Sequence, residues 1–166
     1  MTAARVLVVD DDPWILRMVT ATLQKKQYVV DTAQDGRQAL QKAQASPPDV
    51  VITDVMMPVM DGWAFVQQLR TIPHLAYTPV IFLTALGRDE ATLRQMGIRP
   101  EDYLTKPFRF DDLEKRVTAA LERRKDASAP GYAPTPGSAP TIVPGAPQGY
   151  PPQGYPPQGY PPQGYP

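Results

Sequence analysis

The chain has 166 residues, no cysteine and a formal net charge of zero, from 17 basic and 17 acidic side chains. This length suits one ordinary domain with a modest appendage, and the balanced charge gives no overall preference for nucleic acid or acidic membranes. The lack of cysteine excludes disulfide frameworks, thiolate nucleophiles and cysteine-based metal sites. The apolar run near the N-terminus is four residues long and no stretch reaches membrane-spanning length, so we expect a cytoplasmic protein without membrane insertion.

The composition changes near residue 126. Every Lys, Arg, Asp and Glu lies in residues 1–126, whereas residues 127–166 contain 13 of the 21 prolines, 7 of the 11 glycines and 5 of the 8 tyrosines. A segment this rich in proline and this poor in aliphatic side chains cannot bury enough surface to offset the entropy of ordering it. We therefore expect a folded domain over residues 1–125 and a disordered Pro/Gly/Tyr-rich tail over residues 126–166.

Short apolar runs alternate with helical patterns along the first part of the chain. The apolar runs are typical of strands buried on both faces. They fall at Val6–Val9, Val29–Val30, Val50–Ile52, Val80–Leu83 and Tyr103–Leu104. The helical patterns fall at Ile15–Leu23, Ala39–Ala43, Phe65–Leu69, Leu93–Met96 and Phe110–Leu121. Five strands alternating with five helices predict an α/β fold, with parallel strands joined by right-handed crossovers and covered on both faces.

Polar residues follow four of the five predicted strands. They are Asp10 and Asp11 after the first, Asp54 after the third, Thr84 after the fourth and Lys106 after the fifth. Because open parallel sheets bind ligands beyond the carboxyl ends of their strands, we expect these side chains to form one site. Clustered carboxylates favour a hard divalent cation such as Mg²⁺. One carboxylate can then act as a nucleophile in phosphoryl transfer, while the lysine and the threonine bind phosphoryl oxygens.

Four motifs, in this order and spacing, carry a resemblance to a known family: VLVVDDDP, VVITDVMMPVMDG, VIFLTA and DYLTKPF. They look like the motifs of the receiver domain of bacterial two-component response regulators, over roughly residues 4–125. The resemblance implies a doubly wound, flavodoxin-like sheet of five parallel strands in the order 2-1-3-4-5. It also implies a signalling protein rather than an enzyme, one that promotes its own Mg²⁺-dependent phosphorylation and dephosphorylation.

The resemblance also implies a phospho-acceptor and a metal site. Asp54 matches the family's phospho-acceptor. Asp10 and Asp11 match the acidic pair, of which Asp11 would ligate Mg²⁺ directly and Asp10 would act partly through water. Met56 matches the position whose backbone carbonyl completes the coordination. The metal site implied in this way consists of Asp10, Asp11, Asp54 and the carbonyl of Met56.

Three further positions match residues that bind the phosphoryl group or respond to it. Thr84 and Lys106 match the family's hydroxyl and lysine, and Tyr103 matches its aromatic switch residue. On phosphorylation, Thr84 would be drawn toward the phosphate and Tyr103 would turn inward, which changes the surface of the fourth helix, fifth strand and fifth helix. For Tyr103 a packing role competes with the switch role, because an aromatic at a strand end is usually half-buried packing.

Other polar residues have simpler explanations. Asp12, next to Pro13, is expected to cap a helix, and Asp61–Gly62 is expected to form a turn into the third helix. His74 lies in a polar stretch and is expected to be solvated. The basic run Arg123–Lys125 complements the dipole at the end of the fifth helix and is too small to indicate nucleic-acid binding.

The resemblance implies partners and leaves rivals open. A histidine kinase or a phosphotransfer protein would donate the phosphoryl group to Asp54, and the output is expected to be contact with a downstream protein that the sequence does not identify. One rival is a phosphohydrolase of the haloacid-dehalogenase type, which carries a second Asp two positions after its nucleophile, where this chain has Met56. Another rival makes the domain a phosphate-independent docking module and the tail the functional part.

The tail contains a five-residue repeat. Residues 146–165 read APQGY, PPQGY, PPQGY, PPQGY. Such a segment is expected to alternate short polyproline stretches with flexible Gly-Tyr joints. Two interpretations stay open: a solubilising spacer, or regularly spaced tyrosines that act as weak adhesive points for self-association or for a partner surface.

Overall fold

The computed structural model of the chain describes residues 3–85, 91 and 100–127. At its centre lies a five-stranded sheet in the order β2-β1-β3-β4-β5, in which all neighbouring strands are parallel. The strands are β1 (Arg5–Val9), β2 (Val29–Ala33), β3 (Val50–Asp54), β4 (Val80–Ala85) and β5 (Tyr103–Lys106). The predicted parallel sheet and its strand order are confirmed.

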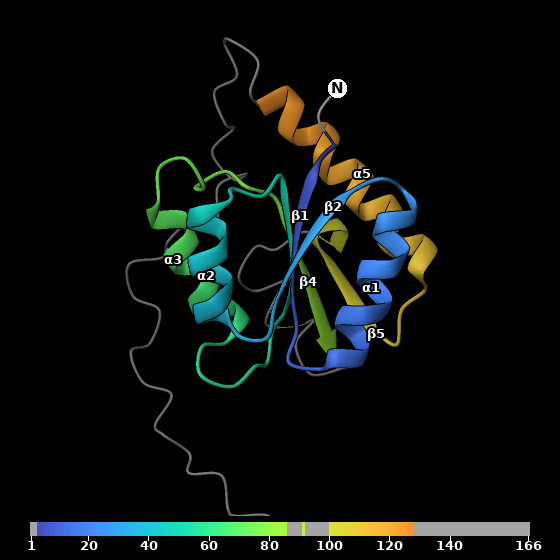
Figure 1. Cartoon of the computed structure of the whole chain (residues 1–166), viewed down its shortest axis with the longest axis horizontal. Coiled ribbons are helices and arrows are strands. Elements are labelled where there is room, and N and C mark those ends of the chain that lie inside the picture. Colours follow the sequence, from blue (N-terminus) through green and yellow to red (C-terminus); the bar gives the residue numbers. More distant parts are fainter. Residues whose placement is uncertain (1–2, 86–90, 92–99, 128–166) are drawn as a thin grey trace, which may run out of the picture.

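Helices cover both faces of this sheet (Figure 1). One face carries α2 (Gly36–Ala45) and α3 (Gly62–Thr71), and the other carries α1 (Pro13–Lys25) and α5 (Phe110–Ala127). A short 3₁₀ turn, η1 (Pro100–Asp102), precedes β5 and was not expected from the sequence. The helix predicted around Leu93–Met96 lies outside the described residues. The layers are those of the doubly wound fold that the alternating pattern predicts.

The apolar side chains form two cores, one on each face of the sheet. Strand β1 contributes to both, because successive side chains of a strand point to opposite faces. Leu7 and Val9 belong to the core under α2 and α3, while Val6 and Val8 belong to the core under α1 and α5. All four side chains are almost completely buried. A continuous apolar run is therefore the correct sequence pattern for a strand covered on both sides.

Strand β2 is longer than the apolar pair that marks it in the sequence. It runs over Val29–Ala33 and, among the described strands, pairs only with β1. An edge strand is half exposed and admits polar residues such as Asp31. The Asp31 carboxylate accepts a hydrogen bond from Nη1 of Arg5 on β1 at 2.7 Å. At this edge a cross-strand pair of opposite charge is thus present beside the apolar contacts that Val30 and Ala33 make with the two cores.

Aspartate side chains begin three of the helices, each by accepting a hydrogen bond from a backbone N–H of the first turn. The bonds run from Trp14 to Asp12, from Gln38 to Asp35 and from Ala64 to Asp61, each at 2.8 Å. Such caps satisfy N–H groups that have no partner within the helix. The capping role predicted for Asp12 and the turn predicted at Asp61–Gly62 are confirmed.

Two arginines fasten the last turns of α5 to the amino-terminal edge of the sheet. Nη2 of Arg123 lies 2.8 Å from Oδ1 of Asp102 in η1. Nη1 of Arg124 donates to the carbonyl of Pro48 at 2.6 Å and lies 3.3 Å from Oδ1 of Asp49. This end of α5 lies far from the arrowhead of β4 (Figure 1). Arg123 and Arg124 therefore hold the end of α5 against the edge of the sheet.

Two further sequence expectations concern the surface. His74 is exposed, as predicted for a solvated residue. Among the helices that the structure describes, none combines the length and the apolar character needed to cross a membrane.

Candidate functional site

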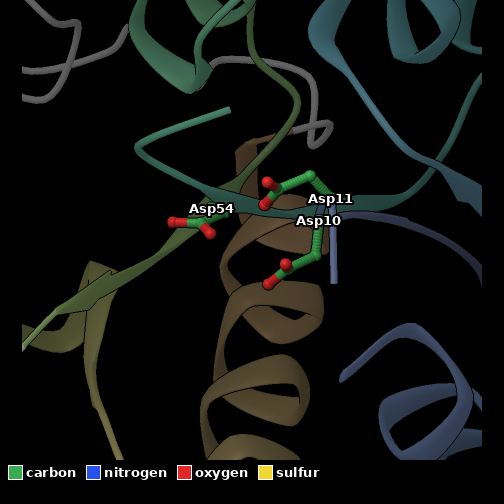
Figure 2. Close-up of side chains that lie close together, drawn as sticks. All are labelled: Asp10, Asp11 and Asp54. Carbon is green, nitrogen blue, oxygen red and sulfur yellow. The ribbon is translucent and has the colours of Figure 1, made fainter. Parts of the chain in front are cut away.

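Three carboxylates meet at the carboxyl edge of the sheet (Figure 2). Asp10 and Asp11 follow β1 directly, and Asp54 is the last residue of β3. The two strands are neighbours, with Val9 paired to Thr53, so the parallel register brings together the residues that follow these two. One oxygen from each carboxylate lies within 4.8 Å of the others. The structure thus gathers the three carboxylates that the sequence predicts at one site.

Lys106 reaches from β5 to two of these carboxylates. Its Nζ lies 2.8 Å from Oδ2 of Asp10 and 3.0 Å from Oδ2 of Asp54. The side chain of Asp10 is completely buried, and its second oxygen accepts the backbone N–H of Asp12 at 2.9 Å. These partners matter because a buried charge without a partner is costly. The lysine therefore ties β1, β3 and β5 together at the site.

The charges of the site shift the pKa values of its buried groups. Burial raises the pKa of Asp10 and the charge of Asp54 adds to this effect, whereas the hydrogen bonds from Lys106 and from the N–H of Asp12 oppose it. Burial lowers the pKa of Lys106, but its hydrogen bonds to Asp10 and Asp54 and their charges outweigh that effect. The pKa of both groups therefore lies above the ordinary value. Lys106 stays a protonated ammonium group among carboxylates.

Thr84 and Met56 lie at the same edge of the sheet. Thr84 is buried near the end of β4, one position beyond Leu83, which is paired with Asp54. Its Oγ1 donates to the carbonyl of Ala85 at 3.1 Å. Met56 is exposed in the loop after β3, and its backbone N–H donates to Oδ1 of Asp54 at 3.3 Å. The loop after β3 thus contacts the carboxylate cluster through Met56, and Thr84 lies at the end of the strand next to Asp54.

Tyr103, unlike the other predicted site residues, lies at the start of its strand and is packed in the hydrophobic core. It begins β5, three positions before Lys106, and its side chain is only 6% exposed. It packs in the core under α2 and α3. The switch role expects an inward turn on phosphorylation, and in this structure Tyr103 already points inward. The geometry agrees with the packing role that the sequence left open beside the switch role.

Gly62 packs against the backbone of Asp54, a role that sequence reasoning missed. Its N–H donates to the carbonyl of Val55 at 2.9 Å. A Cβ at this position would lie 2.1 Å from the carbonyl oxygen of Asp54. Only a residue without a Cβ permits such an approach. The Asp-Gly pair signals a turn in the sequence, but it does not reveal which backbone the glycine meets.

We expect Gly62→Ala to lower the free energy of unfolding by about 2 kcal/mol, because the added methyl group overlaps backbone that can yield only by moving Asp54. Urea denaturation measures this change. Gln67→Ala is the matched control, since Gln67 is exposed in the same helix, and it should change stability by less than about 0.5 kcal/mol. Equally small effects in both variants would show that Gly62 does not hold the loop in place.

Two known sequence families match this chain, one in the folded domain and one in the tail. The family described as response regulator receiver domain matches residues 6–118, and the family described as XYPPX repeat matches residues 145–158 and 154–166. The receiver match includes the three carboxylates and Lys106, whereas the repeat match falls outside the residues that the structure describes. The receiver match and the repeat match thus cover separate stretches of the sequence.

Individual relatives agree with the family match. The chain is 38% identical over 126 residues to the alkaline phosphatase synthesis transcriptional regulatory protein PhoP of Bacillus subtilis, which covers 76% of this chain and 51% of that protein. The solved structure of the chemotaxis response regulator CheY4 of Vibrio cholerae has 42% identity and a TM-score of 0.66, and the match covers 72% of this chain and 100% of that chain. The chain spans about half the length of the curated relatives it matches. It therefore belongs to the receiver-domain family of two-component response regulators.

Proposed function

We propose that Asp54 accepts a phosphoryl group from a histidine kinase or a phosphotransfer protein, and that the chain passes the signal on by contact with another protein. The observation that carries this proposal is the position of Lys106, whose Nζ contacts both Asp10 and Asp54. Phosphoryl transfer needs positioning and charge neutralisation more than covalent assistance. An ammonium group beside a strand-end carboxylate provides both.

The donor set of the site fits Mg²⁺, which prefers oxygen ligands from one or two carboxylates together with water and phosphate oxygens. Asp10, Asp11 and Asp54 offer carboxylate oxygens within 4.8 Å of one another. Asp11, Asp54 and the backbone carbonyl of Met56 would hold the ion directly, and Asp10 would act partly through water. When bound, Mg²⁺ supplies neutralisation of the negative charge that builds up during transfer.

Asp54, Lys106 and Thr84 have separate roles in the phosphoryl transfer. A carboxylate oxygen of Asp54 attacks the phosphorus of the donor's phosphohistidine, so that an O–P bond forms while the P–N bond breaks and the imidazole leaves. Lys106 binds a phosphoryl oxygen through its ammonium group. The Thr84 hydroxyl, whose donor now serves the carbonyl of Ala85, can turn to donate to another phosphoryl oxygen.

The phosphoryl group then acts as a ligand that shifts a two-state equilibrium. Thr84 is drawn toward the phosphoryl group. In the pairing of β4 with β5, Thr84 is the partner of Thr105 and Phe82 is the partner of Tyr103. A change at Thr84 can therefore pass through β5 to the surface beside α5. The switch roles of Thr84 and Tyr103, the downstream protein and the cytoplasmic location stay predictions.

A phosphohydrolase of the haloacid-dehalogenase type has less support. That chemistry needs an acid two positions after the nucleophile, and this position is Met56, whose thioether carries no transferable proton. The family match over residues 6–118 also favours the receiver.

Labelling with a small acyl-phosphate donor tests the proposal. With Mg²⁺ the chain should take up close to one phosphoryl group, and EDTA should abolish the uptake. Asp11→Asn should weaken Mg²⁺ affinity severalfold or more in calorimetric titration, because a charged carboxylate ligand becomes a neutral amide in a site with few protein ligands. Asp61→Asn is the control, since it lies outside the cluster and Asn caps a helix as well as Asp. If neither EDTA nor Asp11→Asn changes the phosphoryl uptake, the proposal that Mg²⁺ assists phosphorylation is contradicted.

We further propose that the domain and the tail divide near residue 125 and that the domain folds and takes up the phosphoryl group without the tail. A chain that stops after Ala127, the last residue of α5, keeps every contact that the structure describes. Its melting temperature should therefore differ from that of the full chain by less than about 3 °C, and its phosphoryl uptake should be unchanged. Calorimetry and labelling measure these quantities. A fall of about 8 °C or more would refute the division.

A further inference from the structure

A groove beside β5 combines apolar rings with guanidinium groups. It has a volume of about 370 Å³ and is formed by η1, β5, the loop after β5 and the first turns of α5. Among its lining residues are Pro100, Pro107, Phe108, Arg109, Asp112 and Arg116. Phe108 packs edge to face against Phe110, with ring centroids 5.8 Å apart, which holds the aromatic wall of the groove in place.

The two arginines supply donors at the border of the groove. Nη1 of Arg116 donates to the carbonyl of Pro100 at 2.7 Å, which fixes the guanidinium across the groove. A guanidinium group carries five N–H donors, more than this one bond uses. The side chain of Arg109 is 81% exposed, and its Nη2 lies 3.7 Å from Oδ2 of Asp111, an exposed pair that leaves most of its donors to solvent. Guanidinium planes stack on tyrosine rings and donate to carbonyl oxygens, so this border suits an uncharged ligand rich in tyrosine and proline.

We propose that this groove binds the chain's own PPQGY repeats, residues 146–165. The repeats carry no charge and present a tyrosine every five residues between prolines. Proline-rich segments bind in aromatic-lined grooves because their extended form loses little entropy on binding. A second groove of about 370 Å³, between α1 and β2, has neither an aromatic residue nor a proline among its lining residues. The chemistry therefore favours the groove beside β5.

The chain between α5 and the repeats has the right length for this contact. Residues 128–145 connect the end of α5 with the first repeat, and a segment of that length spans about 23 Å as a flexible coil and about 56 Å as extended polyproline. From Ala127 back along α5 to Arg116 and Phe110 the distance is about 16 to 26 Å, at 1.5 Å per residue. A connection that matches the span gives the highest effective concentration, about millimolar. Because Arg123 and Arg124 anchor the end of α5, this starting point is fixed.

A nitroxide in the tail tests the proposal in the full chain. The chain has no cysteine, so Gln153→Cys creates a single attachment point in the second repeat. We expect the nitroxide to broaden the amide signals of Arg109 and Arg116 at least threefold more than those of Arg17 and Gln24, which line the other groove. Equal broadening at the two grooves, or stronger broadening beside α1, would overturn the proposal.

Two controls separate docking from simple tethering and from a second copy. In a chain of equal length in which Tyr150, Tyr155, Tyr160 and Tyr165 are replaced by Ser, the selective broadening should disappear. Its persistence would show that tethering alone brings the label near the groove, and the proposal would fail. In a mixture of nitroxide-labelled chain and ¹⁵N-labelled chain without nitroxide, little broadening is expected. Broadening as strong as within one chain would assign the groove to another copy and would also overturn the proposal.

Discussion

Chains that carry Asp54→Asn are expected to take up no phosphoryl label, even with excess acyl phosphate and Mg²⁺. The amide keeps the shape of the carboxylate but only one of its two oxygens, so one of the two donors, Lys106 Nζ or the N–H of Met56, keeps its acceptor. An amide is not a nucleophile toward phosphorus at neutral pH, so the fold survives while the chemistry stops. Asp10 cannot take over, because its side chain is completely buried. Intact-mass spectrometry measures the label.

The matched control is Asp12→Asn. Asp12 follows the acidic pair directly, but its side chain caps α1 by accepting the N–H of Trp14 at 2.8 Å. Asparagine caps a helix as well as aspartate, so this variant should fold normally and take up the wild-type amount of label. Stoichiometric label on the Asp54→Asn chain would show that another residue accepts the phosphoryl group.

Lys106→Met should lower the free energy of unfolding of the metal-free chain by about 3 kcal/mol. The substitution removes the cation that pairs with both Asp10 and Asp54, and it leaves a completely buried carboxylate beside a second one. Methionine keeps much of the apolar stem, so the loss reports the charge rather than the packing. Adding Asp10→Asn to the same chain should recover part of the stability, because the buried charge is then removed.

Lys26→Met provides the comparison for this effect. Nζ of Lys26 lies 3.3 Å from Oε2 of Glu114, but the lysine side chain is 58% exposed, and exposed ion pairs contribute only about 0–1 kcal/mol. Urea denaturation of both variants gives the two values. Similar losses in the two variants, or a gain of stability in Lys106→Met, would contradict the view that Lys106 compensates buried negative charge.

The fold was predictable because each signal rests on local physics. The unbroken apolar run Val6–Val9 divides its side chains between two cores, and only a sheet covered on both faces offers two cores. The helix cap at Asp12 and the turn at Asp61 could be predicted because capping depends only on neighbouring residues. Five such strands joined by helices leave few topologies. The grouping of Asp10 with Asp54 follows from the shared edge of parallel strands.

The remaining features depend on contacts distant in sequence. Arg123 and Arg124 bind partners 21 and 76 residues away, so the sequence indicated only a charged helix end. Lys106 was predicted to face phosphoryl oxygens, but the structure also shows it bonded to Asp10. That bond compensates the burial of Asp10, and the depth of burial cannot be predicted from the sequence alone. For Tyr103 the sequence left packing and switching open, and its burial became visible only in the packed domain.

The most direct test of the central claim is to locate the phosphoryl group within the chain. Borohydride reduces an acyl phosphate to an alcohol, so a phosphorylated aspartate becomes homoserine, which tandem mass spectrometry assigns to a position. After treatment with acyl phosphate and Mg²⁺, the account predicts homoserine at position 54 and none when EDTA is present. Homoserine at position 10 or 11, or an unmodified Asp54 in a chain whose intact mass shows a bound phosphoryl group, would contradict it.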